Sequence, residues 1–138
     1  MKLEELLAQA DKMMEAVEPI TVPVKLNGGQ HLGVRFLPMS GADWRTLTAR
    51  HAPRDGAEKD AARGYNIAGV VAAYPDVVVI TDDAEPDSLL REDSLGHTYS
   101  IWPDVASRLT AKSLEALEFQ MWAAHEYTPE LVEQAGKA

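Results

Sequence analysis

Metal binding is the first chemistry to test, because histidine and cysteine are the side chains that most often hold transition-metal ions. The chain has no cysteine, which also excludes a disulfide framework and a thiol nucleophile. No two histidines form the i, i+4 pair that directs two imidazoles at one ion, and each lies about 20 or more residues from the next. We expect surface or capping roles for all of them, and no metal or other cofactor. They are His31, His51, His97 and His125.

An acidic segment from Thr81 to Asp93 is the second candidate, because it carries more than half of the net negative charge of the chain. Asp83 could open a calcium-binding loop, but Ser88 stands where the sharp turn requires glycine and Ser94 where a bidentate glutamate should close the shell. We therefore expect a solvated loop that keeps the protein soluble or attracts a basic partner. Its candidate partner-binding residues are Asp82, Asp83, Glu85 and Asp87.

Catalytic motifs are missing from the sequence. There is no G-x-S-x-G elbow, no Walker loop and no Rossmann glycine fingerprint. Paired carboxylates need an apolar cleft that separates their pKa values, whereas the acidic run occupies the most polar part of the chain. We therefore expect a protein that is not an enzyme.

Composition limits the remaining classes of function. The 138 residues favour one domain, and 46% hydrophobic with 25% charged residues is typical of a globular protein. A formal net charge of -9 repels nucleic acid and anionic membranes. No run approaches the roughly 20 apolar residues of a membrane span, and Glu4, Glu5 and Asp11 interrupt the start, where a signal peptide would be apolar. Proteins therefore remain as the expected partners.

An amphipathic helix is predicted at residues 1–18, followed by Pro19. Its apolar residues recur at steps of three and four: Leu3, Leu6, Leu7, Ala10, Met13, Met14 and Val17. We favour packing of this face on the protein's own core. The alternative is that the helix presents Leu3, Leu7 and Met14 to a partner.

A β-hairpin is predicted over residues 21–37, because two β-rich runs flank Asn27 and Gly28. Pro23 cannot donate to a ladder, so the first run should be an edge strand or contain a bulge. A third strand is expected at 77–80, with a helical continuation as the alternative, and the alternating residues 97–102 predict a further strand.

Helices are expected to supply most of the domain formed by residues 19–138. One follows Ser40 and runs to about His51, a buried one lies at 65–74, a short one opens at Pro103, and a long one is capped by Thr110. A last short helix is predicted at 130–134, and mobile loops near 52–63 and 81–97. The three tryptophans should lie in the core. The predicted class is α+β, mostly helical, with an N-terminal β-hairpin.

The order of these elements resembles the short tail assembly chaperones of long-tailed bacteriophages, especially those that infect actinobacteria. The resemblance covers about residues 20–127, whereas the acidic segment and the stretch near Tyr99 do not match the family pattern. It depends on the hairpin from Val22 to Leu37, then Asp43-Trp44-Arg45-Thr46-Leu47, His51-Ala52-Pro53, Gly64-Tyr65-Asn66 and finally Trp102, Leu109, Leu114 and Leu117.

The resemblance implies a chaperone of the host cell cytoplasm that is not part of the mature virion. Proteins of this family bind the long, aggregation-prone tape measure protein and help to recruit tail tube protein around it. A frameshifted longer form of the same protein is often a further partner. A structural virion protein, either a head–tail connector or a minor tail subunit, is the alternative. A regulatory protein that imitates nucleic acid ranks last, because the charge is concentrated in one loop.

Overall fold

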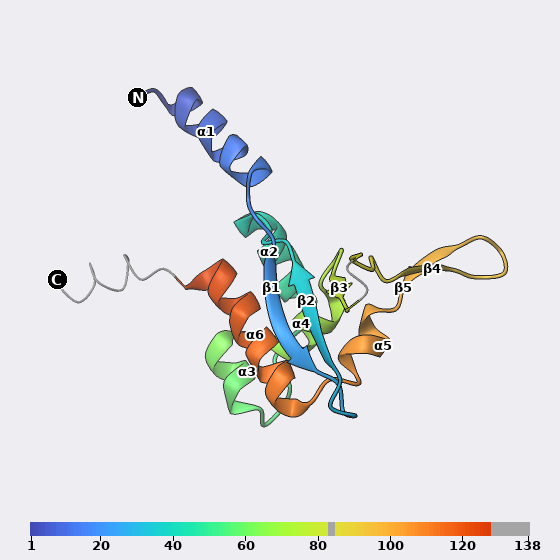
Figure 1. Ribbon diagram of the computed structural model, residues 1–138. Coiled ribbons are helices and arrows are strands. Elements are labelled where there is room, and N and C mark those ends of the chain that lie inside the picture. Colours follow the sequence, from blue (N-terminus) through green and yellow to red (C-terminus); the bar gives the residue numbers. More distant parts are fainter. Residues whose placement is uncertain (83–84, 128–138) are drawn as a thin grey trace.

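The protein is a mixed α+β structure, described here from a computed structural model for residues 1–82 and 85–127 (Figure 1). This confirms the predicted α+β class; the helix predicted at 130–134 lies outside the described residues. The helices are α1 (Leu3–Glu15), α2 (Gly41–Ala49), α3 (Glu58–Arg63), α4 (Ile67–Ala73), α5 (Trp102–Ala106) and α6 (Ala111–Glu126). The strands are β1 (Ile20–Lys25), β2 (His31–Phe36), β3 (Val78–Ile80), β4 (Leu90–Glu92) and β5 (Thr98–Ser100).

The predicted hairpin forms two strands of an antiparallel sheet with the order β1-β2-β3. Val22 pairs with Val34, and Val34 pairs with Val79, so three β-branched residues lie side by side across the sheet. The segment at 77–80 is therefore a strand, and the helical alternative is wrong. In the hairpin turn it is Gly29, at φ 89°, that takes the left-handed conformation favourable to glycine.

Both edges of this sheet are partly closed by other segments. The Lys25 N–H donates to Ser113 Oγ over 2.9 Å, and the Lys25 carbonyl accepts from the Thr110 N–H at 3.0 Å. Pro23 lies two residues earlier on the same edge and has no N–H, as expected for an edge strand. On the other edge Val79 and Asp87 exchange two backbone hydrogen bonds. Part of each edge is thereby closed to a further strand.

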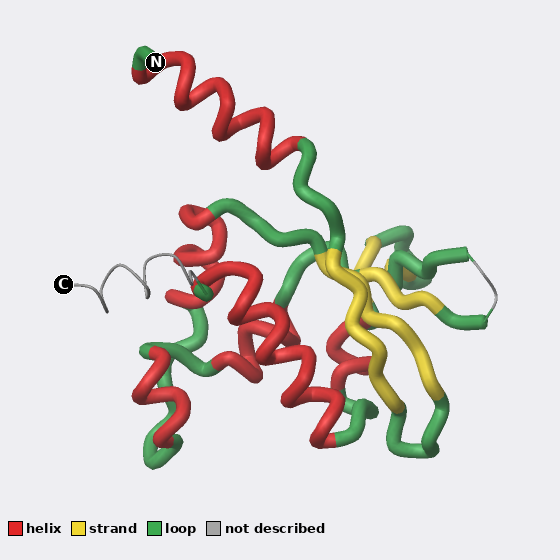
Figure 2. Tube along the Cα trace, turned by 60° about the vertical axis from the view of Figure 1, so that its left-hand side comes forward, coloured by secondary structure: helices red, strands yellow, loops and turns green. Residues whose placement is uncertain are grey.

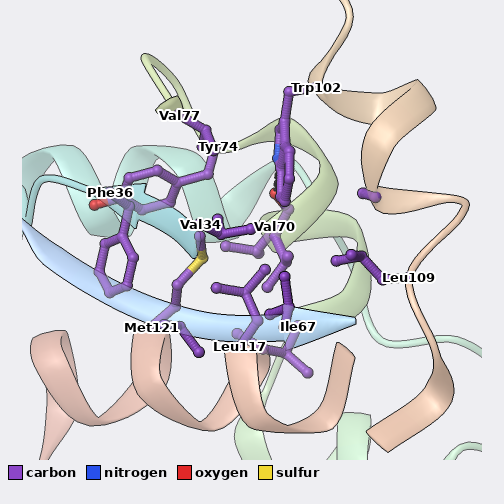
Figure 3. Packing of buried hydrophobic residues seen from close by; sticks show 14 of the residues in the cluster. Val34, Phe36, Ile67, Val70, Tyr74, Val77, Trp102, Leu109, Leu117 and Met121 are labelled. Carbon is purple, nitrogen blue, oxygen red and sulfur yellow. Dashed lines mark hydrogen bonds between the residues drawn. The ribbon is translucent and has the colours of Figure 1, made fainter. Parts of the chain in front are cut away.

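The core lies between the sheet, α4 and α6 (Figure 3). Val34, Val70, Leu117 and Met121 have no exposed surface, and Trp102 is 1% exposed. The Trp102 indole N–H donates to the Val71 carbonyl at 2.7 Å, which ties α5 to the end of α4. Trp44 and Trp102 confirm the prediction of core tryptophans, and Trp122 packs partly buried against the cluster.

Residues 52–63 are more structured than the expected loop, because they include α3. Asp60 is buried at 1% exposure and accepts three hydrogen bonds from Arg54, with a closest Nε–Oδ2 distance of 2.9 Å. The Arg54 guanidinium lowers the pKa of Asp60 to about 2. A helix therefore forms in this charged stretch although it has no apolar face. The buried Asp60 carboxylate that anchors it is fully paired with Arg54.

Asp60→Asn is expected to lower the melting temperature, because it removes the charge that pairs with Arg54. The native pKa is depressed, so the stabilisation is complete above the ordinary value of 3.8 and is lost as the pH falls toward about 2. Glu58→Gln, an exposed change in the same helix, is the matched control. Thermal denaturation at neutral pH checks this; equal melting temperatures of the two variants would contradict it.

Two elements project from the body. Helix α1 extends away at one end, beyond the start of β1 (Figures 1 and 2). The β4–β5 hairpin projects from another side of the body, away from α1, and all of its strand residues are exposed (Figure 1). The turn of this hairpin is held by Asp93, whose Oδ1 accepts from the N–H groups of Leu95 and His97, both at 2.9 Å. The expected loop at 81–97 therefore contains a strand, β4, and the strand expected within 97–102 is β5.

Candidate partner-binding surface

Helix α1 presents its apolar face to solvent. None of its residues is buried, and the side chains predicted to contact a partner are exposed by 63% at Leu3, 57% at Leu7 and 41% at Met14. The expectation that this face packs on the protein's own core is wrong. The core is already covered by α4 and α6, and the chain leaves α1 through Glu18 and Pro19 before it enters β1. The apolar face is therefore available to a partner.

An apolar groove lies where α1 meets the body. Its volume is about 560 Å³. Met14 of α1 and Val17, which follows the helix, line the groove. Leu37, 50% exposed, is the most exposed large hydrophobic side chain that the body contributes to it. The other lining residues are Pro38, Met39, Ser40, Asp43, Thr46, Leu47, Arg50, Ala73, Pro75 and Asp76. Met14 belongs to both the stripe and the groove, and we call the two together the α1 surface.

The floor of the groove is held in place by Tyr74 and His125. The Tyr74 hydroxyl donates to the Leu37 carbonyl at 2.6 Å, and the Met39 N–H donates to His125 Nε2 at 3.1 Å. The imidazole of His125 stacks on Trp44 with ring centroids 4.0 Å apart and planes 3° from parallel. These contacts anchor residues 37–39, which lead from β2 into α2 and form the floor of the groove.

His125 is therefore not a surface histidine, unlike the exposed His31 and His97. Its Nε2 accepts from Met39, so the hydrogen-bond network assigns the proton to Nδ1, which donates to the Met121 carbonyl at 2.6 Å. Burial lowers the pKa of His125, since the imidazolium would lose solvation. The sequence signal was its position four residues after Met121, on the face of α6 that carries the core.

Acidification is expected to destabilise the protein through His125. The unfolded chain binds the proton more readily, so stability is complete above the ordinary pKa of 6.5 and falls as the pH drops below it. His125→Phe keeps a ring against Trp44 but cannot titrate, so its urea midpoint should change less between pH 7.5 and pH 5.5. His31→Gln is the control at an exposed site. The same acid sensitivity in His125→Phe as in the unsubstituted protein would refute this role.

The acidic candidates do not act as one unit. Asp82 and Glu85 are exposed, and Asp83 lies outside the described residues. Asp87 is engaged within the protein: its Oδ1 accepts from the Leu89 N–H at 2.8 Å, and its Oδ2 lies 3.0 Å from Arg91 Nη2. The hydrogen bond from Arg91 lowers the pKa of Asp87. This carboxylate therefore holds the backbone turn that precedes β4. In that turn Leu89 is buried and its backbone has a φ of 64°.

Within residues 1–82 and 85–127, no three histidine, aspartate or glutamate side chains gather in a way that could hold a metal ion. In the same part of the chain no helix is both long and apolar enough to cross a bilayer. The chemistry that α1 exposes is apolar.

Comparison of the chain with protein-family models, curated proteins and solved structures found no match. The periodicity of residues 1–18 indicated Leu3, Leu7 and Met14 as alternative partner-binding residues, whereas nothing in the sequence predicted the groove. Leu37 and Leu47 belong to different predicted elements, and no local pattern indicated that they line one surface.

Proposed function

We propose that the protein is a phage tail assembly chaperone that binds the tape measure protein and is not an enzyme. The observation that carries this proposal is the exposed apolar stripe of α1, continued by the groove below it. A chaperone for an aggregation-prone helical client needs such a surface, because amphipathic segments bind through their apolar faces.

The length of α1 supports the same proposal. The helix has 13 residues and buries none of them, and isolated helices shorter than about 12–15 residues are marginal in water. Glu4 and Glu5 in the first turn and Lys12 in the last favour the helix through its dipole, but each such charge contributes only about 0.3–1 kcal/mol. Contact with a client helix would supply the missing stabilisation.

Repeated weak binding would then explain how a small protein protects a long client. Each bound segment removes apolar surface from solution, and several copies on one tape measure protein act together. The net charge of -9 would keep the coated client soluble. Recruitment of tail tube protein, and association with a longer frameshifted form, belong to the same proposal.

Co-expression with the tape measure protein of the same genome tests the proposal. The client should become soluble and co-purify with this protein from the host cytoplasm. A client that stays insoluble, also when any longer frameshifted form is present, would contradict the chaperone function.

The β4–β5 hairpin favours a second candidate, a head–tail connector or minor tail subunit. Its turn carries Leu95 with 79% exposure, and Tyr99 on β5 is 50% exposed. An arm of this kind suits a permanent contact between neighbouring subunits, because a two-stranded hairpin alone is marginal. Purified virions separate the two candidates: a structural subunit is retained in them and a chaperone is lost.

A further inference from the structure

The two borders of the apolar stripe on α1 differ in chemistry. At 100° per residue, Glu4, Asp11 and Glu15 fall within about 40° of arc on one side of the stripe, next to Leu7. On the other side Leu6 and Met13 widen the apolar face. No ion pair of the described residues involves any of the three acids, and all three are exposed. The stripe therefore has one acidic border and one apolar border.

We propose that the partner of α1 is an amphipathic helix whose apolar stripe is bordered by lysines or arginines where it faces Glu4, Asp11 and Glu15. The inference rests on the proposed function and specifies the client segment by its chemistry. Opposite charges beside an apolar seam select the partner and its orientation in paired helices. The rim of the groove adds Asp43 and Asp76 against one arginine, Arg50, so the negative potential continues along the α1 surface.

A second copy of α1 fits this face poorly in either orientation. In an antiparallel pair the acidic borders of the two helices would face each other, and like charges in that position repel. In a parallel pair Glu4 and Asp11 would lie against Leu6 and Met13 of the other copy, so carboxylates would lose water without gaining a partner. A partner with a basic border avoids both costs.

Two synthetic helical peptides test the inference with the full-length protein. They share one length and one leucine stripe, and they carry either lysine or glutamate at the positions that border the stripe. Fluorescence anisotropy should show about 10-fold tighter binding of the lysine peptide at low salt, since three exposed pairs each contribute a few-fold at most. The advantage should shrink as added salt screens the charges.

Charge reversal provides the matched comparison. The variant Glu4→Lys, Asp11→Lys, Glu15→Lys should prefer the glutamate peptide. The control Glu5→Lys, Asp55→Lys, Glu92→Lys changes the net charge equally at exposed positions away from the acidic border, and it should keep the preference for lysine.

Three results would overturn the inference: equal affinity for both peptides, no binding of either peptide, or an equal change of preference in the two variants. Sedimentation of the protein alone adds a fourth. If it is a dimer that Leu3→Asp with Leu7→Asp converts to a monomer, the partner is a second copy. These assays contain no tape measure protein. The preference for a partner with a basic border can therefore be refuted while co-expression with the tape measure protein still succeeds.

Discussion

Replacing Leu3 and Leu7 with aspartate is expected to abolish co-purification with the tape measure protein while the melting temperature of the body stays unchanged. Both side chains are exposed, and α1 contributes no buried residue, so the core loses nothing. Burial of a leucine on binding contributes about 1.5–3 kcal/mol, so losing two weakens binding by more than about 100-fold. Pull-down from co-expressing cells and differential scanning calorimetry measure the two effects.

The matched control places the same two aspartates on the polar side of the same helix. Ala8→Asp with Gln9→Asp adds equal charge and costs a similar amount of helix propensity, but leaves the apolar stripe intact. This variant should still solubilise the client. Retained binding by the Leu3 and Leu7 variant, or equal loss in the control, would show that the client does not bind through the stripe.

Trp102→Ala is expected to lower the free energy of unfolding by about 3–5 kcal/mol. The side chain is 1% exposed, and its removal leaves a cavity between α4 and α5. The Val71 carbonyl also loses the indole N–H that it accepts from at 2.7 Å. Domains are stable by about 5–15 kcal/mol, so the variant should unfold at a much lower urea concentration.

Trp102→Phe separates packing from hydrogen bonding at this position. It keeps most of the apolar volume and removes the N–H donor, while the Val71 carbonyl still accepts the Tyr74 N–H at 3.3 Å. Its loss should therefore be nearer to about 0.5–1.5 kcal/mol, the net contribution of one hydrogen bond. Urea denaturation followed by far-UV circular dichroism measures both variants. If the two lost the same amount, packing of the indole would contribute nothing beyond its hydrogen bond.

Local chemistry made several elements predictable. Ser40 Oγ accepts from the Asp43 N–H at 3.2 Å and Thr110 Oγ1 from the Ser113 N–H at 3.3 Å, so both predicted helix starts are confirmed. The hairpin at Asn27 was predictable for the same reason, since turn and cap residues act on neighbours within about four positions. The resemblance to tail assembly chaperones, and the binding role of Leu3 and Leu7, stay predictions.

Contacts between residues far apart in the sequence could not be predicted from these local patterns. The sequence favoured a strand at Val77–Ile80 but left a helical continuation as the alternative, and the pairing of Val79 with Val34 on β2 decides for the strand. The charged stretch at 52–63 includes helix α3, whose Asp60 pairs with Arg54. His125 accepts a hydrogen bond from Met39, which lies 86 residues away in the sequence.

Caps, turns and periodicity act over short distances, so they were enough to predict where most of the described helices and strands begin. Which faces are covered depends on how the whole chain packs. The apolar stripe of α1 has the same periodicity whether it packs on its own core or meets a partner, and only the prior occupation of that core by α4 and α6 leaves it exposed. Burial depends on the competition among all apolar faces of the chain, which no single segment encodes.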